Sequence, residues 1–442
     1  MTRRFQLFGF LFLMSVGASV QAQSPCPPLL PGNPTCYSGQ DENRAYYLMA
    51  VPEAYNGRLV LWNHGYSLSP PAPLTQATDL GFPVVLLAEG FAVAASSYRP
   101  DALGLGGWAV ADASIDTDNL RVRFINMFGR PSATYVVGAS EGGIITAEIA
   151  EQFGVAKDGS LNYDGSLPMC GPLAGGRRNY YGAFDLRVVY QYYCQNLPRP
   201  DEPQYPLYLG LAPDDTLTTS ELASRVNECT GILIAPEQRT PDQAQNLANI
   251  LGVTKIPASF LLTDLSYATF AMRELVQVRA AGHNPVTNLG VFYTGSTDDD
   301  ALNAGVYRAG SDPDGLAYII SAYDPTGAVP MPTFTMHTTG DGLVIVENER
   351  AYRETLEAAG TDGNLFQTVS SPVSDGHCAF SLAEFEGGFH SLLEWVQSGN
   401  PPTQQRVADL CEQYRPVVGG MCSFNPGYEV QPFESRVLPR DP

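Results

Sequence analysis

Short apolar runs alternate with helix-like stretches over the first part of the chain. Four of the runs are typical of buried strands, and they lie at residues 59–62, 91–96, 135–137 and 166–169. Helices are predicted between them at about 114–128 and 144–153, and residues 82–90 fit a helix or a loop. This alternation predicts an α/β fold with a mostly parallel sheet flanked by helices on both faces.

The strand and helix rhythm stops near residue 175 and returns near residue 330. The intervening segment contains aromatic, Pro-rich and mixed helical stretches without an internal repeat. Beyond it we predict a strand in "TFTMHTTGDGLV", a helix over 347–359, a strand over 365–369 and a helix in "SLAEFEGGFHSLLEWVQSG". Roughly 150 residues, about the size of a domain, therefore interrupt a single α/β core.

The first 22 residues have the pattern of a secretory signal. Two arginines precede an apolar run from Phe5 to Val20, and the triplet ending at Ala22 supplies the small residues that a signal peptidase reads. The run is short for a membrane span and has no charged stop on its far side. We therefore expect cleavage after Ala22, a secreted or periplasmic protein, and no membrane association after cleavage.

These patterns predict four segments. Residues 1–22 are the signal peptide, and residues 23–174 are the first part of the core. A lid or cap insertion occupies residues 175–329, between the sixth and seventh strands. Residues 330–442 complete the core and end in a disulfide-tied tail.

The charge balance is strongly acidic, with 46 acidic against 25 basic residues and a formal net charge of −21. Such a surface repels nucleic acid and anionic lipid. We therefore expect no nucleic-acid partner. The net charge of the surface says little about a site for a small molecule, because the residues that line such a site determine what it binds.

The chain has eight cysteines, and an even number after a signal peptide indicates disulfides. Closeness in sequence suggests Cys26 with Cys36 and Cys411 with Cys422. The other four would pair among themselves: Cys170, Cys194, Cys229 and Cys378. The chain contains no CxxC pair, its five histidines are scattered, and it has no glycine-rich phosphate loop. We therefore expect neither a metal nor a cofactor. A calcium ion on the acidic loops "STDDDALN" and "SDPDG" of the insertion is the alternative to solvated turns there.

The stretch Gly138-Ala139-Ser140-Glu141-Gly142 matches G-x-S-x-G between a predicted strand and a predicted helix. A sharp turn there exposes the serine hydroxyl but presses its neighbours together, so Gly138 and Gly142 must lack side chains. The helix N-terminus offers free N–H groups, and the amide of Glu141 is the first donor for an oxyanion. Ser140 is thus a candidate nucleophile, with a helix-capping serine as the alternative. We expect the Glu141 side chain to be solvated.

With these features the sequence resembles the α/β-hydrolase superfamily over about residues 45–170 and 330–400, but not over the insertion. The resemblance implies the chain order nucleophile, acid, histidine. The base is expected in the loop before the last helix, where "SDGHCAFS" places His377. The other four histidines belong to other elements: His64, His283, His337 and His390.

The acid is expected after a strand in the second part of the core. Asp341 follows an apolar strand and has glycines on both sides, which also suits a simple turn residue. A carboxylate there would accept a hydrogen bond from His377 and hold its tautomer. Asp375 and Glu347 are the second and third choices for this role.

Two further features follow from the resemblance. "LWNHGYS" looks like the HG loop of the superfamily, so the backbone N–H of Tyr66 is expected to be the second oxyanion donor. "HC" at His377-Cys378 and the early "VPEAYNGRLV" are similar to the tannase and feruloyl-esterase branch. In that branch the cysteine beside the histidine bonds to one just before the serine, where this chain has Ala139. Cys378 is therefore predicted to bond to Cys170 or Cys229.

The sequence thus predicts a secreted serine hydrolase that cleaves carboxylic esters, small or polymeric, through an acyl-enzyme. A secreted aminopeptidase or prolyl-peptidase relative on the same fold is the alternative. A binding module without catalysis is a third hypothesis, although such a module has no need to keep serine, aspartate and histidine in this order.

Overall fold

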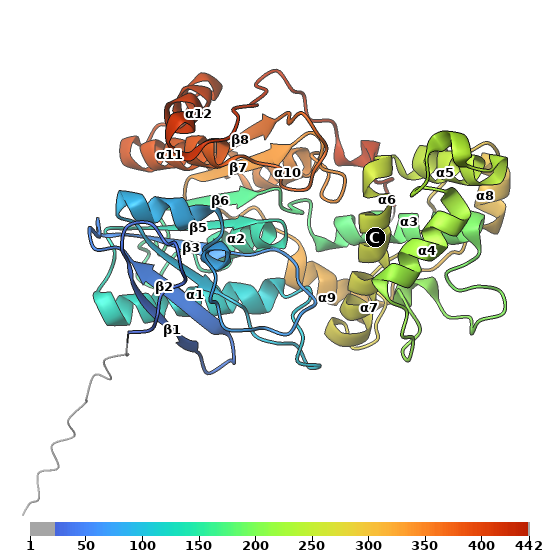
Figure 1. Cartoon of the computed structure of the whole chain (residues 1–442), viewed down its shortest axis with the longest axis horizontal. Coiled ribbons are helices and arrows are strands. Elements are labelled where there is room, and N and C mark those ends of the chain that lie inside the picture. Colours follow the sequence, from blue (N-terminus) through green and yellow to red (C-terminus); the bar gives the residue numbers. More distant parts are fainter. Residues whose placement is uncertain (1–22, 441–442) are drawn as a thin grey trace, which may run out of the picture.

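In the computed structural model, which describes residues 23–440, one eight-stranded sheet forms the centre of the protein (Figure 1). The strand order is β1-β2-β4-β3-β5-β6-β7-β8. β2 pairs antiparallel with β1 and β4, and the strands from β4 to β8 are parallel. The strands are β1 Thr35–Gln40, β2 Tyr46–Val51, β3 Arg58–Asn63, β4 Ala92–Ser96, β5 Ala133–Ala139, β6 Gly165–Met169, β7 Thr333–Thr338 and β8 Leu365–Ser370.

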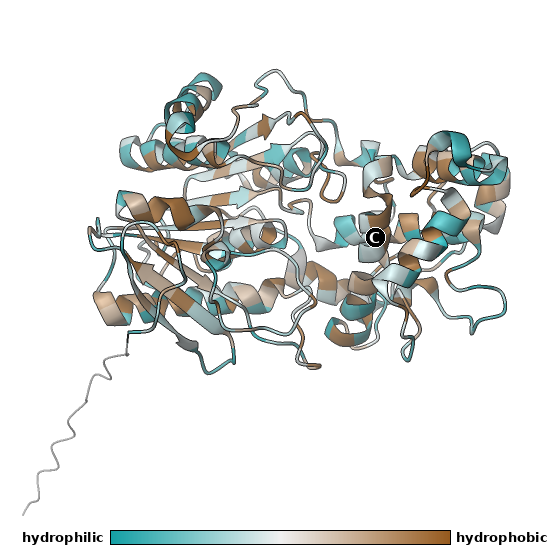
Figure 2. Cartoon of the chain, in the orientation of Figure 1, coloured by the Kyte–Doolittle hydropathy of each residue, from teal (hydrophilic) through white to brown (hydrophobic). Residues whose placement is uncertain are grey.

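Helices cover both faces of this sheet, as the alternation predicts. The α-helices of the core are α1 Val110–Phe128, α2 Glu141–Gln152, α10 Asn348–Ala359, α11 Leu382–Ser398 and α12 Gln404–Val418. In β3, Leu59 and Leu61 pack in the cluster that includes residues of α1 and α2, whereas Val60 and Trp62 pack in the cluster that includes residues of α11 and α12. Successive strand residues point to opposite faces, so a strand buried on both sides must be apolar throughout. Figure 2 shows the hydrophobic residues concentrated along the central strands.

A helical segment lies between β6 and β7 in the chain. It contains α3 Gly176–Cys194, α4 Thr219–Thr230, α5 Pro241–Thr254, α6 Leu261–Ser266, α7 Met272–Glu274, α8 Asp299–Gly305 and α9 Pro313–Tyr323. Figure 1 shows most of it beside the sheet, whereas α9 contacts α1 of the core as well as α3. The boundaries that we assigned to a lid remain predictions.

Shorter helical turns connect these elements. The 3-10 helices are η1 Ala77–Leu80, η2 Phe82–Glu89, η3 Leu207–Leu209, η4 Pro236–Gln238, η5 Ala258–Phe260, η8 Asp362–Asn364 and η9 Phe433–Ser435, and the π-helical turns are η6 Tyr267–Ala271 and η7 Leu275–Arg279. None of the helices within residues 23–440 is long and apolar enough to cross a bilayer. The predicted signal peptide lies outside the described residues.

The strand order and the connections are those of the α/β-hydrolase fold, so the predicted fold class is confirmed. Several elements differ from the sequence predictions. α2 begins at Glu141 rather than near residue 144, because Gly142 and Gly143 weaken the helical pattern although they lie in its first turn. β1 was missed within the Pro- and Gly-rich start of the chain, because its partner β2 supplies the pairing.

All eight cysteines form disulfides. The predicted bonds Cys26–Cys36 and Cys411–Cys422 are confirmed. Of the two partners predicted for Cys378, the structure has Cys170, which lies 208 residues away in the chain. The remaining bond, Cys194–Cys229, joins the end of α3 to α4.

Candidate active site

Ser140 occupies the sharp turn between β5 and α2. Its φ of 62° and ψ of −129° lie outside the regions that L-residues favour. A Cβ on Gly138 would overlap the carbonyl of Gly142, and a Cβ on Gly142 would overlap the carbonyl of Asn63. Both elbow glycines are therefore required by close backbone packing, as the G-x-S-x-G spacing predicts.

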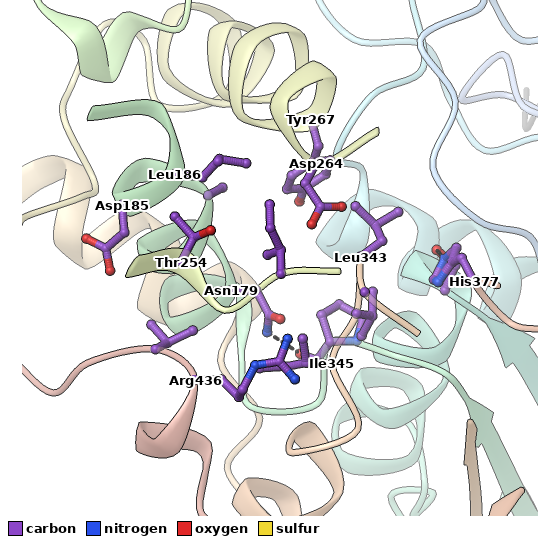
Figure 3. A pocket seen from close by; sticks show the side chains of 18 of the residues that line it. Asn179, Asp185, Leu186, Thr254, Asp264, Tyr267, Leu343, Ile345, His377 and Arg436 are labelled. Atoms are coloured by element: carbon purple, nitrogen blue, oxygen red, sulfur yellow. Dashed lines mark hydrogen bonds between the residues drawn. The ribbon is translucent and has the colours of Figure 1, made fainter. Parts of the chain in front are cut away.

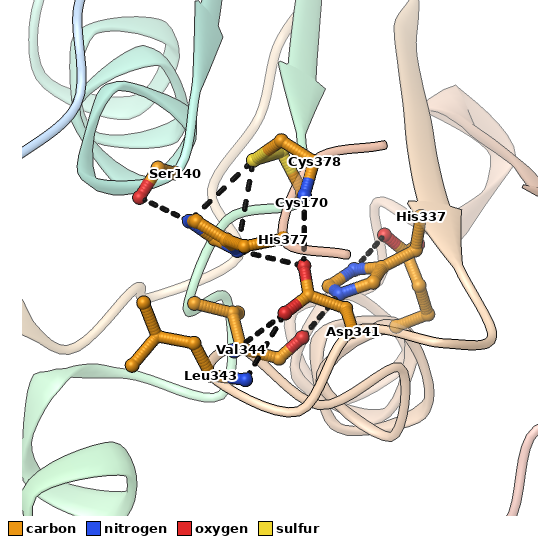
Figure 4. The surroundings of a disulfide bond; sticks show 9 residues. Ser140, Cys170, His337, Asp341, Leu343, Val344, His377 and Cys378 are labelled. Carbon is orange, nitrogen blue, oxygen red and sulfur yellow. Dashed lines mark hydrogen bonds and ion pairs between the residues drawn. A yellow bond between two sulfur atoms is a disulfide. The ribbon is translucent and has the colours of Figure 1, made fainter. Parts of the chain in front are cut away.

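The imidazole of His377 lies between Ser140 and Asp341, although these residues come from three separate parts of the chain (Figure 4). Nε2 is 2.7 Å from the Ser140 Oγ, and Nδ1 is 2.7 Å from the Asp341 Oδ2. A proton on Nδ1 that is donated to the carboxylate leaves Nε2 free to accept the hydroxyl proton. The arrangement suits general-base activation of a serine.

Backbone N–H groups hold the Asp341 carboxylate in place. Its Oδ1 accepts from the amides of Leu343 at 3.1 Å and Val344 at 3.0 Å, and its Oδ2 accepts from Cys378 at 3.2 Å. The side chain is buried. These hydrogen bonds keep the carboxylate directed at Nδ1 of His377, the position from which it can orient the imidazole.

The Cys170–Cys378 disulfide ties the histidine loop to the end of β6. The Cα atoms of the two cysteines are 5.4 Å apart. The Cys378 Sγ lies 3.5 Å from Nε2 of His377. Cys170 follows β6, the neighbour of the strand that leads to Ser140. The bond therefore limits how far the imidazole can move from the serine.

The alternative acids lie elsewhere. Asp375 accepts a hydrogen bond from Ser259 at 3.3 Å, and Glu347 faces Arg436 at 3.6 Å. The other histidines also have separate partners: Tyr98 stacks on His64, Asp312 contacts His283, Glu349 contacts His337, and Glu386 contacts His390. Only His377, among the histidines of the described chain, has a hydrogen bond to Ser140.

The predicted oxyanion donors border the same cavity as Ser140. Gly65 and Tyr66 of the HG loop line it, and an ideal Cβ on Gly65 would lie 3.1 Å from the Ser140 Cβ. Glu141 is the first residue of α2, so its N–H has no acceptor within the helix. The roles of Tyr66 and Glu141 as donors remain predictions.

The prediction that the Glu141 side chain is solvated is wrong. It is 3% exposed, and its Oε1 accepts a hydrogen bond from the amide of Ala109 at 2.6 Å. Burial, and secondarily the charge of Glu274, raise the pKa of Glu141 to about 8. Glu274 in turn accepts from the amide of Trp108 at 3.0 Å. The two acids hold adjacent amides of one loop, a contact over long sequence distances that no local pattern indicates.

A cavity of about 490 Å³ opens above Ser140 and His377 (Figure 3). Its wall is mostly apolar and combines three parts of the chain. Leu343 and Ile345 come from the loop after β7, Leu186 and Tyr267 from the helical segment, and Val437 from the C-terminal tail. The sequence did not indicate that the tail reaches the site.

Asp264 of α6 is an acidic residue of this cavity that the sequence analysis missed. It is 8% exposed, and its Oδ1 is buried without a hydrogen-bond partner among the described residues. Burial, followed by the charge of Asp341, raises the pKa of Asp264 well above its usual value, whereas Arg436 opposes the shift. The surroundings of this carboxyl therefore favour its neutral form over its charged form.

Several solved structures are similar to this chain at low sequence identity. No family model matches the chain, and no curated protein sequence matches it. The rice cell wall degrading esterase LipA from Xanthomonas oryzae is 12% identical with a TM-score of 0.40, over 87% of this chain and 90% of that one. Feruloyl esterase B from Aspergillus oryzae is 13% identical with a TM-score of 0.40, over 84% and 82%.

Candida antarctica lipase A in its closed state is also similar, at 13% identity and a TM-score of 0.44, over 90% of each chain. At these identities and TM-scores the similar structures say nothing about the substrate of this protein. The fold class follows from the strand order of its own sheet. The protein has the α/β-hydrolase fold, with a serine, a histidine and an aspartate in hydrogen-bond contact at the carboxyl edge of the sheet.

Proposed function

We propose that the protein is an exported serine hydrolase that cleaves carboxylic esters. One observation carries the proposal, namely that the His377 ring bridges the Ser140 hydroxyl and the Asp341 carboxylate at 2.7 Å on each side. The apolar cavity above the hydroxyl supports it, because an ester is a neutral substrate whose hydrocarbon parts gain from burial.

In this mechanism the Ser140 Oγ attacks the ester carbonyl while Nε2 of His377 takes the hydroxyl proton. Asp341 stabilises the resulting imidazolium. The amides of Tyr66 and Glu141 stabilise the oxyanion, and one such donor contributes about 3 kcal/mol in the transition state. His377 returns the proton to the leaving alcohol. Water, activated by the same imidazole, then hydrolyses the acyl-enzyme and releases the carboxylic acid.

The test is covalent labelling with a fluorophosphonate, followed by peptide mass spectrometry. We expect the label on Ser140, and we expect hydrolysis of a p-nitrophenyl ester to fall by about 10³-fold or more in Ser140→Ala. Ser220→Ala is the matched control, because Ser220 is exposed on α4. A label on another residue, or an active Ser140→Ala protein, contradicts the proposal.

Asp264 favours a second candidate function, a secreted peptidase, because an acid in the cavity can bind the free amine of a peptide. Since burial raises the pKa of Asp264, its charge is suppressed, and we rank the ester first. An aminoacyl p-nitroanilide and a p-nitrophenyl ester separate the two candidates. A peptidase would cleave the anilide faster, and Asp264→Asn would reduce anilide cleavage far more than ester cleavage.

Export is part of the proposal. The four disulfides support it, since such bonds persist in oxidising compartments. We expect the mature protein to begin at Gln23, which N-terminal sequencing of the exported form would test. The cavity volume suits a small ester or the end of a polymer chain.

A further inference from the structure

Two carboxylates and an imidazole converge at a place that the candidate active site does not use. Glu89 ends η2, whereas Glu386 and His390 lie one helical turn apart on α11. The Nε2 of His390 is 3.1 Å from Glu89 Oε2 and 3.2 Å from Glu386 Oε2. The ligand atoms of all three residues lie within 4.8 Å of one another.

Hydrogen bonding alone satisfies this cluster poorly. Nε2 carries at most one proton, yet oxygens of both carboxylates surround it. The contact with Glu89 Oε1 is a long hydrogen bond of 3.3 Å. Glu386 is only 1% exposed, and its Oε2 has no hydrogen-bond partner despite its closeness to Nε2. This buried oxygen therefore depends on an imidazole that it shares with Glu89, and a further partner would stabilise it.

The surroundings hold the imidazole in a fixed orientation. The ring of Tyr414 stacks on that of His390, with centroids 4.3 Å apart and planes 15° from parallel. Tyr414 belongs to α12, which packs against α11 (Figure 1). A ring held in this way keeps Nε2 directed at the two carboxylates, and such orientation of a ligand strengthens metal binding.

We propose that Glu89, Glu386 and His390 form a binding site for a divalent transition-metal ion of the zinc type. An ion about 2.1 Å from Nε2 and from Glu386 Oε2, atoms 3.2 Å apart, would make an angle of about 100° between them, which zinc accepts. One imidazole nitrogen with carboxylate oxygens suits zinc better than calcium or magnesium, which prefer all-oxygen ligands.

The site is accessible to an ion and leaves room for water as a further ligand, because 29% of the Glu89 side chain is exposed. A bound ion would give the Glu386 oxygen a partner in addition to the imidazole of His390. It would also join η2 to α11, elements that are distant in the chain. The expected role is structural, because none of the three residues lines the cavity above Ser140.

The experiment is calorimetric titration of the metal-stripped full chain with zinc chloride, together with thermal unfolding with and without zinc. We expect one zinc ion per chain and a higher unfolding midpoint when zinc is present. Glu89→Gln should weaken binding by about tenfold or more and reduce the rise in midpoint. Glu89 is the informative variant because it is the most exposed ligand, so its loss does not endanger folding.

Two matched controls identify the site. Glu394→Gln removes an exposed carboxylate of the same helix, one that pairs with Arg406, and should leave zinc binding unchanged. His283→Ala removes an exposed histidine beside Asp312 and Asp314, where zinc could also bind weakly. The proposal is overturned if zinc does not bind, or if binding survives Glu89→Gln but is lost in His283→Ala. Hydrolysis of a p-nitrophenyl ester should be the same in Glu89→Gln and the original protein.

Discussion

Glu141 shows what a single residue adds to this site. Its backbone amide is a predicted oxyanion donor, while its side chain is a buried acid that holds the amide of Ala109. Besides burial, the charge of Glu274 raises the pKa of Glu141, and the charge of Arg279 lowers it. The charge of Glu141 in turn raises the pKa values of three nearby tyrosines, namely Tyr66, Tyr98 and Tyr267. A carboxyl in this position is easier to bury as the neutral acid.

The pH dependence of stability follows from that burial. Because the pKa of Glu141 rises from 4.5 to about 8 on folding, the folded protein keeps a proton that the unfolded chain releases. The contribution of Glu141 to the free energy of unfolding is therefore most favourable below pH 4.5 and is lost as the pH rises towards 8. A tenfold difference in proton affinity between the folded and unfolded states corresponds to about 1.4 kcal/mol. Urea unfolding should show that Glu141→Gln gains stability over the original protein between pH 5 and 8.

Glu237→Gln is the control for this prediction, because Glu237 is exposed. The difference in unfolding free energy between Glu237→Gln and the original protein should stay constant over the same pH range. Equal pH dependence of Glu141→Gln and the original protein would contradict the expected protonation of Glu141.

At the scale of elements, the turn from β5 into α2 places Ser140 where the sheet ends. The close approach of β3 to the first turn of α2 permits this only if residue 142 has no side chain. We expect Gly142→Ala to abolish ester hydrolysis and to destabilise the fold by about 1–3 kcal/mol or more, because the new methyl group displaces backbone.

Gly363→Ala serves as the matched substitution, because Gly363 is exposed and a Cβ there meets no atom within 4 Å. Circular dichroism melting and p-nitrophenyl ester assays on both variants test the point. If Gly142→Ala keeps normal activity, the elbow does not require its glycine.

The Cys170–Cys378 bond connects β6 to the histidine loop, so its loss should affect catalysis as well as stability. We expect the double variant Cys170→Ala/Cys378→Ala to lose about 2–5 kcal/mol of unfolding free energy. We also expect kcat to fall more than KM changes, because the imidazole is less well positioned.

Cys26→Ala/Cys36→Ala removes the disulfide between Cys26 and Cys36, which precedes most of the sheet in the chain, and provides the comparison. It should lower the unfolding midpoint while kcat stays close to that of the original protein. Similar kcat values for the two double variants would show that the tether does not position His377.

In the whole molecule, the C-terminal tail connects the core to the helical segment. Arg440 forms a buried ion pair with Asp185 of α3, donates to the carbonyl of Thr287, and lies 4.6 Å from the ring centroid of Tyr181. The tail residues just before Arg440 line the cavity, so this contact also determines one wall of the site.

Removal of Arg440 should therefore destabilise the protein strongly. Arg440→Ala leaves Asp185 buried without its cation, which typically costs about 3–5 kcal/mol. Arg415→Ala removes an exposed pair with Glu412 and should cost about 1 kcal/mol or less. Chemical unfolding of both variants measures the difference. Asp185→Asn combined with Arg440→Ala should recover part of the loss, and a lack of recovery would contradict the role of the ion pair.

The sequence determined those features that depend on short stretches of chain. Apolar runs and helix-like stretches predict the sheet and its covering helices, because strands buried on both faces must be apolar. Ser140 lies between glycines that its turn requires, and Asp341 and His377 each follow a predicted strand in a short loop. The structure brings these three side chains together, although their catalytic roles remain a proposal.

Only the tertiary structure decided which distant groups share a buried environment. The raised pKa of Glu141, the unpaired oxygen of Asp264 and the ion pair of Arg440 each depend on residues far away in the chain. The same holds for the choice of Cys170 over Cys229 as the partner of Cys378. Burial and pairing are properties of packed elements, so patterns within one segment determine where a turn lies but not what surrounds it.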